Sequence, residues 1–289
     1  MQKLIVGSTV LASGLLTRGQ LRWNYRPVYP DVYLRKDLLP TLRARSFAAW
    51  LWSGGRAVVA GRAAAAMHRA EWIDDDIPVE LIHDADRSPS GMIVRNERLA
   101  TDEITRVDHL PVTTAERTAL DLGRHLTQFP ALKHLDSLAR AKPVDLDAVV
   151  ALTRRYAGAR GVARARRVVP LTDAGAQSPK ESWLRLVLIN AGFPRPQTQI
   201  HVSDGFRNAY IDLGWEEPKI GLDYEGDHHR ALRDRYVRDI GRYELIESQG
   251  WADLRVVSEH SAGFVTARVR DIFERRGWER SGHRRRDCA

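Results

Sequence analysis

The stretch LDYEGDHHR, residues 222–230, gathers side chains that could do chemistry. It contains three carboxylic acids and two adjacent histidines: Asp223, Glu225, Asp227, His228 and His229. An apolar run typical of a buried strand precedes them. Carboxylates at the end of a buried strand need a cation, a hydrogen-bond donor or water. The pattern therefore predicts either a metal site or an acidic turn that begins at Gly226.

A further carboxylate, Asp212, lies on a second predicted strand in the run NAYIDLGW. Neighbouring strands can place Asp212 beside Asp223. Two carboxylates within about 4–6 Å repel, and each raises the other's pKa unless a cation lies between them. With oxygen ligands only, the expected cation is Mg²⁺. We therefore expect a magnesium site between these two strands.

Glu181 is the candidate for a third acid, on a helix that precedes these strands. The run Ser178-Pro179-Lys180-Glu181 also has the form of a capping box with proline at the first helical position. The two roles do not exclude each other, so Glu181 is predicted to cap its helix and is also a candidate for the acidic site.

The elements that must position these acids form an α/β pattern. A hairpin and a third strand, followed by a helix that crosses to a fourth strand, indicate a mixed sheet. The predicted helices cover residues 179–190, 234–249 and 262–276, and the predicted strands cover 198–203, 208–214, 219–224 and 253–258. We place this domain at 173–279. The candidate linker, 171–179, spans its beginning, and we expect 280–289 to be a disordered basic tail.

The beginning of the chain predicts a reduced winged helix. Two short helices are expected within residues 8–24, the first capped by Ser8 and closed by Gly14, the second begun at Thr17. A hairpin over 26–34 follows them.

The rest of the first domain, 1–172, is expected to be mainly helical with a small antiparallel sheet. Thr113, with Glu116 three residues later, predicts a capping box at the start of one helix. Other helices are predicted over 38–52 and 63–68, and two antiparallel strands over 78–84 and 91–97.

Charge is distributed unevenly between the two predicted domains. The chain has 289 residues and a formal net charge of +8. Residues 1–172 hold 26 of the 45 Lys and Arg residues and 18 of the 37 acidic residues, so the first domain carries the whole excess. A polyanion such as DNA would therefore meet the first domain, although an arginine-rich surface alone does not establish such binding.

The single cysteine, Cys288, excludes an internal disulfide framework and a cysteine-based zinc finger. The apolar start of the chain is interrupted by glycine and serine, and no run approaches the ~20 apolar residues of a membrane span. We expect a cytoplasmic protein without a membrane partner.

Residues 177–276 resemble the DUF-559 group of endonuclease-like domains, relatives of the very-short-patch repair nucleases in the PD-(D/E)XK superfamily. The features occur in order: Glu181, Asp212, the acid-x-acid-Gly run Asp223 to Gly226, His229, Asp239 with Arg242, and Gly250-Trp251. One departure concerns the acids, because this chain has Asp223-x-Glu225 where the family usually has Glu-x-Asp.

The resemblance implies Mg²⁺-dependent hydrolysis of DNA phosphodiester bonds. Its metal ligands would be Asp212, Asp223 and the Tyr224 carbonyl, with Glu181 and Glu225 in the same site. By the same resemblance His229 would be the general acid or base, with His228 in reserve. Arg242 would steady the phosphate or pair with Asp239, and an ordinary salt bridge between residues three apart on a helix is an equal alternative.

The first domain resembles the AbiEi-type antitoxin-like modules, through YPDVYL, the pair PVELIHD and IVRNE, and above all LPVTTAERTALDL. This resemblance implies DNA as a partner, with Arg18, Arg22 and Arg26 as candidates for phosphate contacts. It also implies a protein partner of the toxin–antitoxin type.

Two functions remain open at this point. The acid and histidine motifs favour a Mg²⁺-dependent endonuclease, which acts in repair or defence. The exchanged acids favour a DNA-binding regulator of the antitoxin type that has lost catalysis. We expect the endonuclease and keep the regulator as the alternative.

Overall fold

A computed structural model describes residues 3–85, 87–225 and 233–277, with the backbone alone for 233–239. The chain divides into two compact units, residues 1–174 and 175–289. This division falls two residues from the predicted domain boundary. Among the described residues, no helix has both the length and the apolarity that a membrane span requires.

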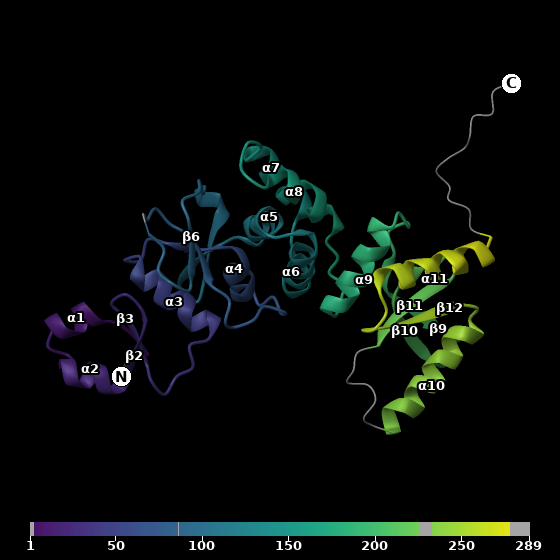
Figure 1. Ribbon diagram of the computed structural model, residues 1–289, viewed down its shortest axis with the longest axis horizontal. Coiled ribbons are helices and arrows are strands. Elements are labelled where there is room, and N and C mark those ends of the chain that lie inside the picture. Colours follow the sequence, from purple (N-terminus) through teal and green to yellow (C-terminus); the bar gives the residue numbers. More distant parts are fainter. Residues whose placement is uncertain (1–2, 86, 226–232, 278–289) are drawn as a thin grey trace. The chain divides into compact units, whose positions relative to one another are not determined.

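The first unit begins with a reduced winged helix, as predicted (Figure 1). Its three strands are antiparallel in the order β1-β3-β2, and β1 is absent from the prediction. A small core of Ile5, Val10, Leu21 and Tyr25 joins the helices to the sheet. The elements are β1 (Leu4–Val6), α1 (Gly7–Ala12), α2 (Arg18–Asn24), β2 (Tyr25–Tyr29) and β3 (Val32–Arg35).

The predicted caps of the two short helices have different outcomes. Thr17 caps α2 in a full capping box, because Thr17 and Gln20 bond each other's backbone N–H groups. Ser8 does not cap α1, which begins one residue earlier at Gly7. The Ser8 backbone N–H instead donates to Asp31 Oδ1 at 2.8 Å, so Ser8 ties the helix to the hairpin turn.

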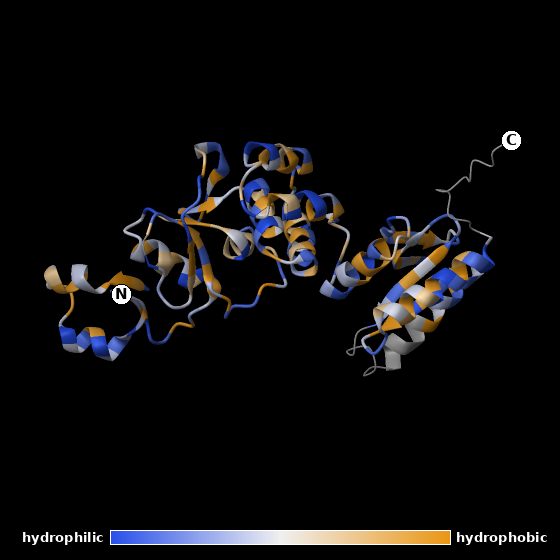
Figure 2. Cartoon of the chain, turned by 45° about the horizontal axis from the view of Figure 1, so that its top comes forward, coloured by the Kyte–Doolittle hydropathy of each residue, from blue (hydrophilic) through white to orange (hydrophobic). Residues whose placement is uncertain are grey.

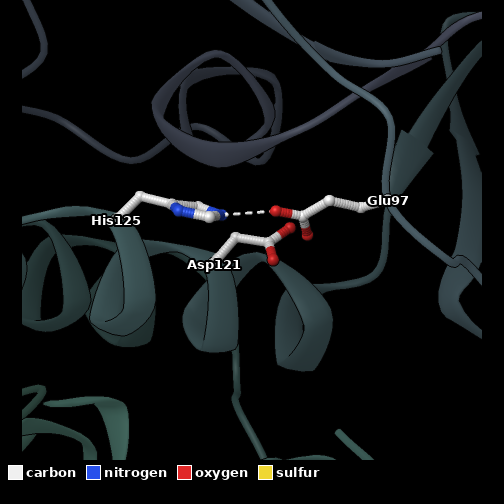
Figure 3. Close-up of side chains that lie close together, drawn as sticks. All are labelled: Glu97, Asp121 and His125. Atoms are coloured by element: carbon white, nitrogen blue, oxygen red, sulfur yellow. Dashed lines mark ion pairs between the residues drawn. The ribbon is translucent and has the colours of Figure 1, made fainter. Parts of the chain in front are cut away.

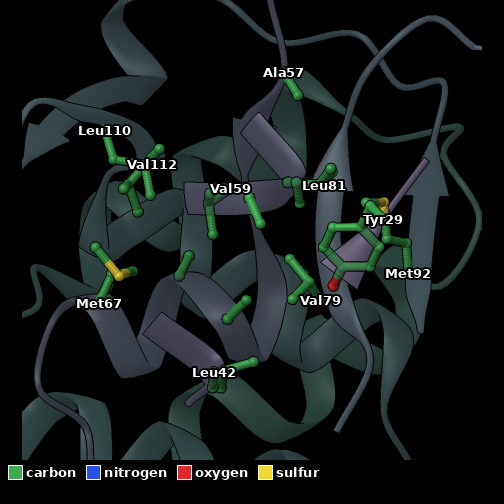
Figure 4. Packing of buried hydrophobic residues seen from close by; sticks show 14 of the residues in the cluster. Tyr29, Leu42, Ala57, Val59, Met67, Val79, Leu81, Met92, Leu110 and Val112 are labelled. Atoms are coloured by element: carbon green, nitrogen blue, oxygen red, sulfur yellow. The ribbon is translucent and has the colours of Figure 1, made fainter. Parts of the chain in front are cut away.

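A five-stranded sheet in the order β6-β5-β4-β8-β7 follows the winged helix. Buried side chains from α3, α4 and the sheet form its core (Figure 4). The elements are α3 (Leu42–Trp52), β4 (Val58–Val59), α4 (Gly61–Met67), β5 (Val79–Ile82), β6 (Met92–Arg95), η1 (Thr101–Glu103), β7 (Ile104–Val107) and β8 (Leu110–Thr113).

The predicted antiparallel pairing of β5 with β6 is wrong. The two strands run parallel, with Val79 opposite Met92 and Ile82 opposite Arg95. The alternation of side chains identifies strands but does not give their direction.

A group of helices completes the first unit, and its first cap also differs from the prediction. Thr114 caps α5, since its hydroxyl accepts the Arg117 N–H at 3.2 Å. Thr113 is the last residue of β8, and its buried hydroxyl bonds the Thr118 hydroxyl. The helices are α5 (Ala115–His125), α6 (Gln128–Ala141), α7 (Leu146–Arg155), α8 (Val162–Val168) and η2 (Val169–Leu171).

The second unit is the predicted mixed sheet covered by helices. Its strand order is β12-β11-β10-β9, with β11 and β12 parallel and the other pairs antiparallel. Apolar residues of α9 and α11 pack on one face and those of α10 on the other. The elements are α9 (Pro179–Asn190), β9 (Gln197–Ser203), β10 (Asn208–Trp215), β11 (Ile220–Glu225), α10 (Arg233–Ser248), β12 (Ala252–Val257) and α11 (Ala262–Arg275).

Hydropathy along the chain agrees with this layering. In Figure 2 the strands of the sheets are mainly hydrophobic, while the covering helices carry both hydrophobic and hydrophilic residues. Helices of that mixed character bury one side on a sheet and expose the other to water. The acids of β10 and β11 are therefore exceptions within largely apolar strands.

Candidate functional site

Asp212 and Asp223 lie at the point where β10 and β11 separate. Regular pairing of these strands covers Leu213–Trp215 and Ile220–Leu222. Beyond it, side chains replace the backbone ladder: the Asp212 N–H donates to Asp223 Oδ1, and the Tyr224 N–H donates to Asp212 Oδ2, both at 3.0 Å. The structure thus brings the two predicted acids together, and each carboxylate bonds the opposite strand.

An arginine supplies positive charge at this fork. Arg242 of α10 places Nη2 2.7 Å from Oδ2 of the buried Asp223, and the guanidinium also donates to the Tyr210 carbonyl. Burial raises the pKa of Asp212, and the charge of Asp223 raises it further. Arg242 therefore offsets only part of the negative charge on the two acids.

Asp253 is a third carboxylate at the fork, and sequence reasoning missed it. It lies opposite Gly221 on the parallel strand β12. Its Oδ1 is buried without a hydrogen-bond partner among the described residues. Burial raises the pKa of Asp253 to about 7, and the charge of Asp223 adds to the effect. The one available signal was a carboxylate in a strand whose other residues, apart from Arg255, are apolar.

Glu181 is buried at the start of α9 and connects to the fork through Gln199. The Ser178 hydroxyl accepts the Glu181 N–H at 3.2 Å, which is the predicted cap. The returning carboxylate accepts the Gln177 N–H at 2.8 Å rather than that of Ser178. Gln199 Nε2 lies 3.4 Å from Glu181 Oε2, and the Gln199 side chain also bonds Asp212. Glu181 thus takes part in the cap of α9, and the Gln199 side chain lies between it and Asp212.

Glu225 has different partners from Asp223. The Tyr243 hydroxyl donates to Glu225 Oε1 at 3.0 Å, and Arg255 Nε lies 3.6 Å from the same oxygen. The predictions for His228, His229 and the side chain of Asp239 lie outside the described residues. The role of His229 in proton transfer and the Asp239–Arg242 pair therefore stay predictions.

The carboxylates at the fork meet part of what a Mg²⁺ site requires. Two carboxylates and an excess of negative charge suit a hard divalent ion, which commonly takes one or two carboxylates and completes its shell with water. Within the described part of the chain, however, three ligand atoms come within 4.8 Å of one another only at Glu97, Asp121 and His125. The fork can offer Asp212 and Asp223 to Mg²⁺, but among the described residues it does not bring together three ligand atoms from acidic, histidine or cysteine side chains. The predicted Tyr224 carbonyl ligand is outside that comparison and stays a prediction.

The predicted DNA-contacting arginines differ in their surroundings. Arg18 and Arg22 are exposed one turn apart on α2, next to Trp23, whose side chain is 81% exposed. Arg26 instead donates to the Lys36 carbonyl at 2.7 Å and also to that of Leu38. Its guanidinium therefore holds the segment after β3, whereas α2 presents its cations to solvent.

Two proteins of Mycobacterium tuberculosis are similar to this chain over most of its length. They are "Uncharacterized protein MT2308" of strain CDC 1551 / Oshkosh and "Uncharacterized protein Rv2248" of strain ATCC 25618 / H37Rv. Each is 25% identical over 253 residues, which cover 86% of this chain and 92% of the relative. No solved structure matches the chain.

A family match covers part of the first unit. It begins just before β4 and ends with η2, so it includes neither the winged helix nor the residues that resemble the DUF-559 domains. Residues 57–171 match the AbiEi antitoxin C-terminal domain family.

Proposed function

We propose that this protein is an antitoxin-type regulator that binds DNA. The observation that carries the proposal is the match of residues 57–171 to an antitoxin domain, in the same unit as a winged helix that precedes it along the chain. A toxin protein is the partner that this family implies. The proposal reverses the order of the two functions expected from the sequence, because the match supports the regulator and gives no support to a nuclease.

The helix α2 is the part of the winged helix that we assign to DNA. In helix-turn-helix proteins the second helix enters the major groove, and cationic side chains contact phosphates. Arg18 and Arg22 are exposed on α2 and free to reach a phosphate backbone, and Trp23 adds an exposed aromatic surface. Residues 1–172 also hold the whole net positive charge of the chain.

The test measures binding to the duplex upstream of the protein's own coding sequence, with a shuffled duplex for comparison. Arg18→Ala combined with Arg22→Ala should weaken binding and reduce the slope of log K against log salt by about 2. Arg268→Ala combined with Arg270→Ala removes the same charge from exposed positions on α11 and should leave binding unchanged. Equal loss in both double variants would mean that net charge, not α2, controls binding.

A second candidate function, Mg²⁺-dependent DNA cleavage, is favoured by one specific observation. Asp212, Asp223 and Asp253 lie on adjacent strands, and Arg242 balances only part of their charge. A bound Mg²⁺ would polarise a phosphate and lower the pKa of an attacking water. Arg242 would hold the phosphate near Asp223. Gln199, which contacts both Asp212 and Glu181, would fix the positions of these two carboxylates.

Supercoiled plasmid nicking tests this second function. The native protein with Mg²⁺ should nick the plasmid, and chelation should stop it. Asp212→Asn is the informative variant because its amide oxygen can still accept the Tyr224 N–H while the negative charge is lost. Residual cleavage equal to that of the native protein would indicate a contaminating nuclease and leave the regulator as the function.

A further inference from the structure

Glu97, Asp121 and His125 form a compact group of metal-binding side chains inside the first unit. Glu97 lies on the segment after β6, and Asp121 and His125 lie one turn apart on the same side of α5 (Figure 3). One ligand atom from each residue lies within 4.8 Å of the other two. Glu97 Oε1 and His125 Nε2 are 3.3 Å apart.

One atom of this group lacks the partner that its burial requires. Asp121 is 2% exposed, and its Oδ2 has no hydrogen-bond partner among the described residues. His125 Nε2 is also buried, and its contact there is the ion pair with Glu97 Oε1 rather than a hydrogen bond of good geometry. Buried polar atoms are nearly always paired, so a bare carboxylate oxygen beside this pair points to a ligand that binds Asp121 Oδ2.

Neighbouring arginines fix the carboxylates and leave Asp121 Oδ2 available. Arg117 Nε bonds Asp121 Oδ1 at 3.0 Å, on the other oxygen of that carboxylate. Arg124 holds Glu97 through Oε2 at 2.7 Å and Oε1 at 3.2 Å. Metal-binding carboxylates are commonly oriented by such hydrogen bonds, which reduce the freedom lost on binding.

The charge of the surrounding network admits a cation. Within the described residues, four carboxylates are joined to three guanidinium groups by ion pairs. The carboxylates are Glu97, Asp102, Glu103 and Asp121, and the guanidinium groups are those of Arg117, Arg124 and Arg155. Counted as ionised, the carboxylates exceed the guanidinium groups by one.

We propose that Glu97, Asp121 and His125 bind a divalent transition metal of the Zn²⁺ class. Ligands about 2.0–2.1 Å from a tetrahedral Zn²⁺ lie about 3.3 Å from one another, which is the separation of Glu97 Oε1 and His125 Nε2. An imidazole beside two carboxylates favours Zn²⁺ and related late transition-metal ions over Ca²⁺ and Mg²⁺. The ion would join the segment after β6 to α5 and so stabilise the fold of the first unit.

The test uses the full-length chain, stripped of metal, and titrates it with Co²⁺ and then Zn²⁺. We expect one tight site, visible d–d absorption of Co²⁺ with a nitrogen ligand, its loss when Zn²⁺ displaces Co²⁺, and a higher Tm with Zn²⁺. His125→Gln should weaken that site more than about 100-fold. It keeps Cys288 and the other nine histidines, so any adventitious binding persists in it.

His201→Gln is the matched control, since His201 is exposed in the second unit and bonds Asn208. It should retain the tight site. Equal stoichiometry and affinity in native protein and His125→Gln would overturn the proposal. An unchanged Tm of the native protein on addition of Zn²⁺ would also overturn it. Thermal unfolding without metal establishes that both variants are folded.

Discussion

At the scale of single residues, the sequence could predict that Asp212 and Asp223 lie together but not which groups balance their charges. Asp212 and Asp223 follow from two recognisable strands, since adjacent strands bring such positions together. The ion pair from Arg242 depends on how α10 packs, and the place of Asp253 depends on the register of β12 with β11. Neither packing nor register is encoded in a local pattern, so the pairing of Arg242 with Asp223 and the place of Asp253 had to come from the structure, although the resemblance had named Arg242.

Asp253 should make the free energy of unfolding depend on pH. Its pKa is about 7 in the folded protein against 3.8 for an unperturbed aspartate, so the folded state binds the proton more tightly than the unfolded chain. This contribution to stability is complete below the unfolded pKa and is lost as pH rises toward 7. Between about pH 5 and pH 8 the loss is on the order of 2–3 kcal/mol, an upper value for a partly exposed group.

Asp253→Asn should remove that loss. Urea unfolding at the two pH values should show that the free energy of unfolding of the variant, relative to that of the native protein, is greater at the higher pH. Glu216→Gln, which removes an exposed carboxylate of the same unit, should run parallel to the native protein. A constant difference between native protein and Asp253→Asn at both pH values would show that Asp253 titrates normally.

At the scale of elements, helices and strands were predictable because their signals are local. The capping box at Thr17 needs only residues within one turn, and the structure has it. The cap of α5 was misplaced by one residue because Thr113 and Thr114 are both threonines, and only the end of β8 separates them. The direction of β6 is decided by the whole sheet, which no local pattern contains.

Gly161 shows how closely two helices of the first unit approach. It has a φ of +84°, and a Cβ there would lie 2.3 Å from the Arg124 carbonyl oxygen on α5. Gly161→Ala should lower the free energy of unfolding by about 1–3 kcal/mol, from backbone strain and from separation of α5 and α8. Gly158→Ala is the matched control, because a Cβ at Gly158 meets open space and its φ is unstrained. Equal effects in urea unfolding would contradict this account.

At the scale of the whole molecule, the two units differ in charge and in resemblance. The first carries the winged helix, the antitoxin-family match and the net positive charge. The second carries the carboxylates of the fork and equal numbers of basic and acidic residues from 173 onward. The linker, the charge distribution and the order of the predicted elements gave this division and the fold class, whereas the choice between regulator and nuclease depended on a family match that ends at residue 171.

The division permits a direct assignment of DNA binding. Cleaving the chain within 172–177, through an inserted protease site, should yield two fragments because each unit has its own core. The first fragment should bind the upstream duplex with the affinity of the intact chain, since Arg18 and Arg22 lie in it. The second should bind weakly at most, because net attraction to phosphates requires an excess of cations. If the second fragment retained the binding instead, the acidic fork with Arg242 would be the nucleic-acid site, and cleavage would become the leading function.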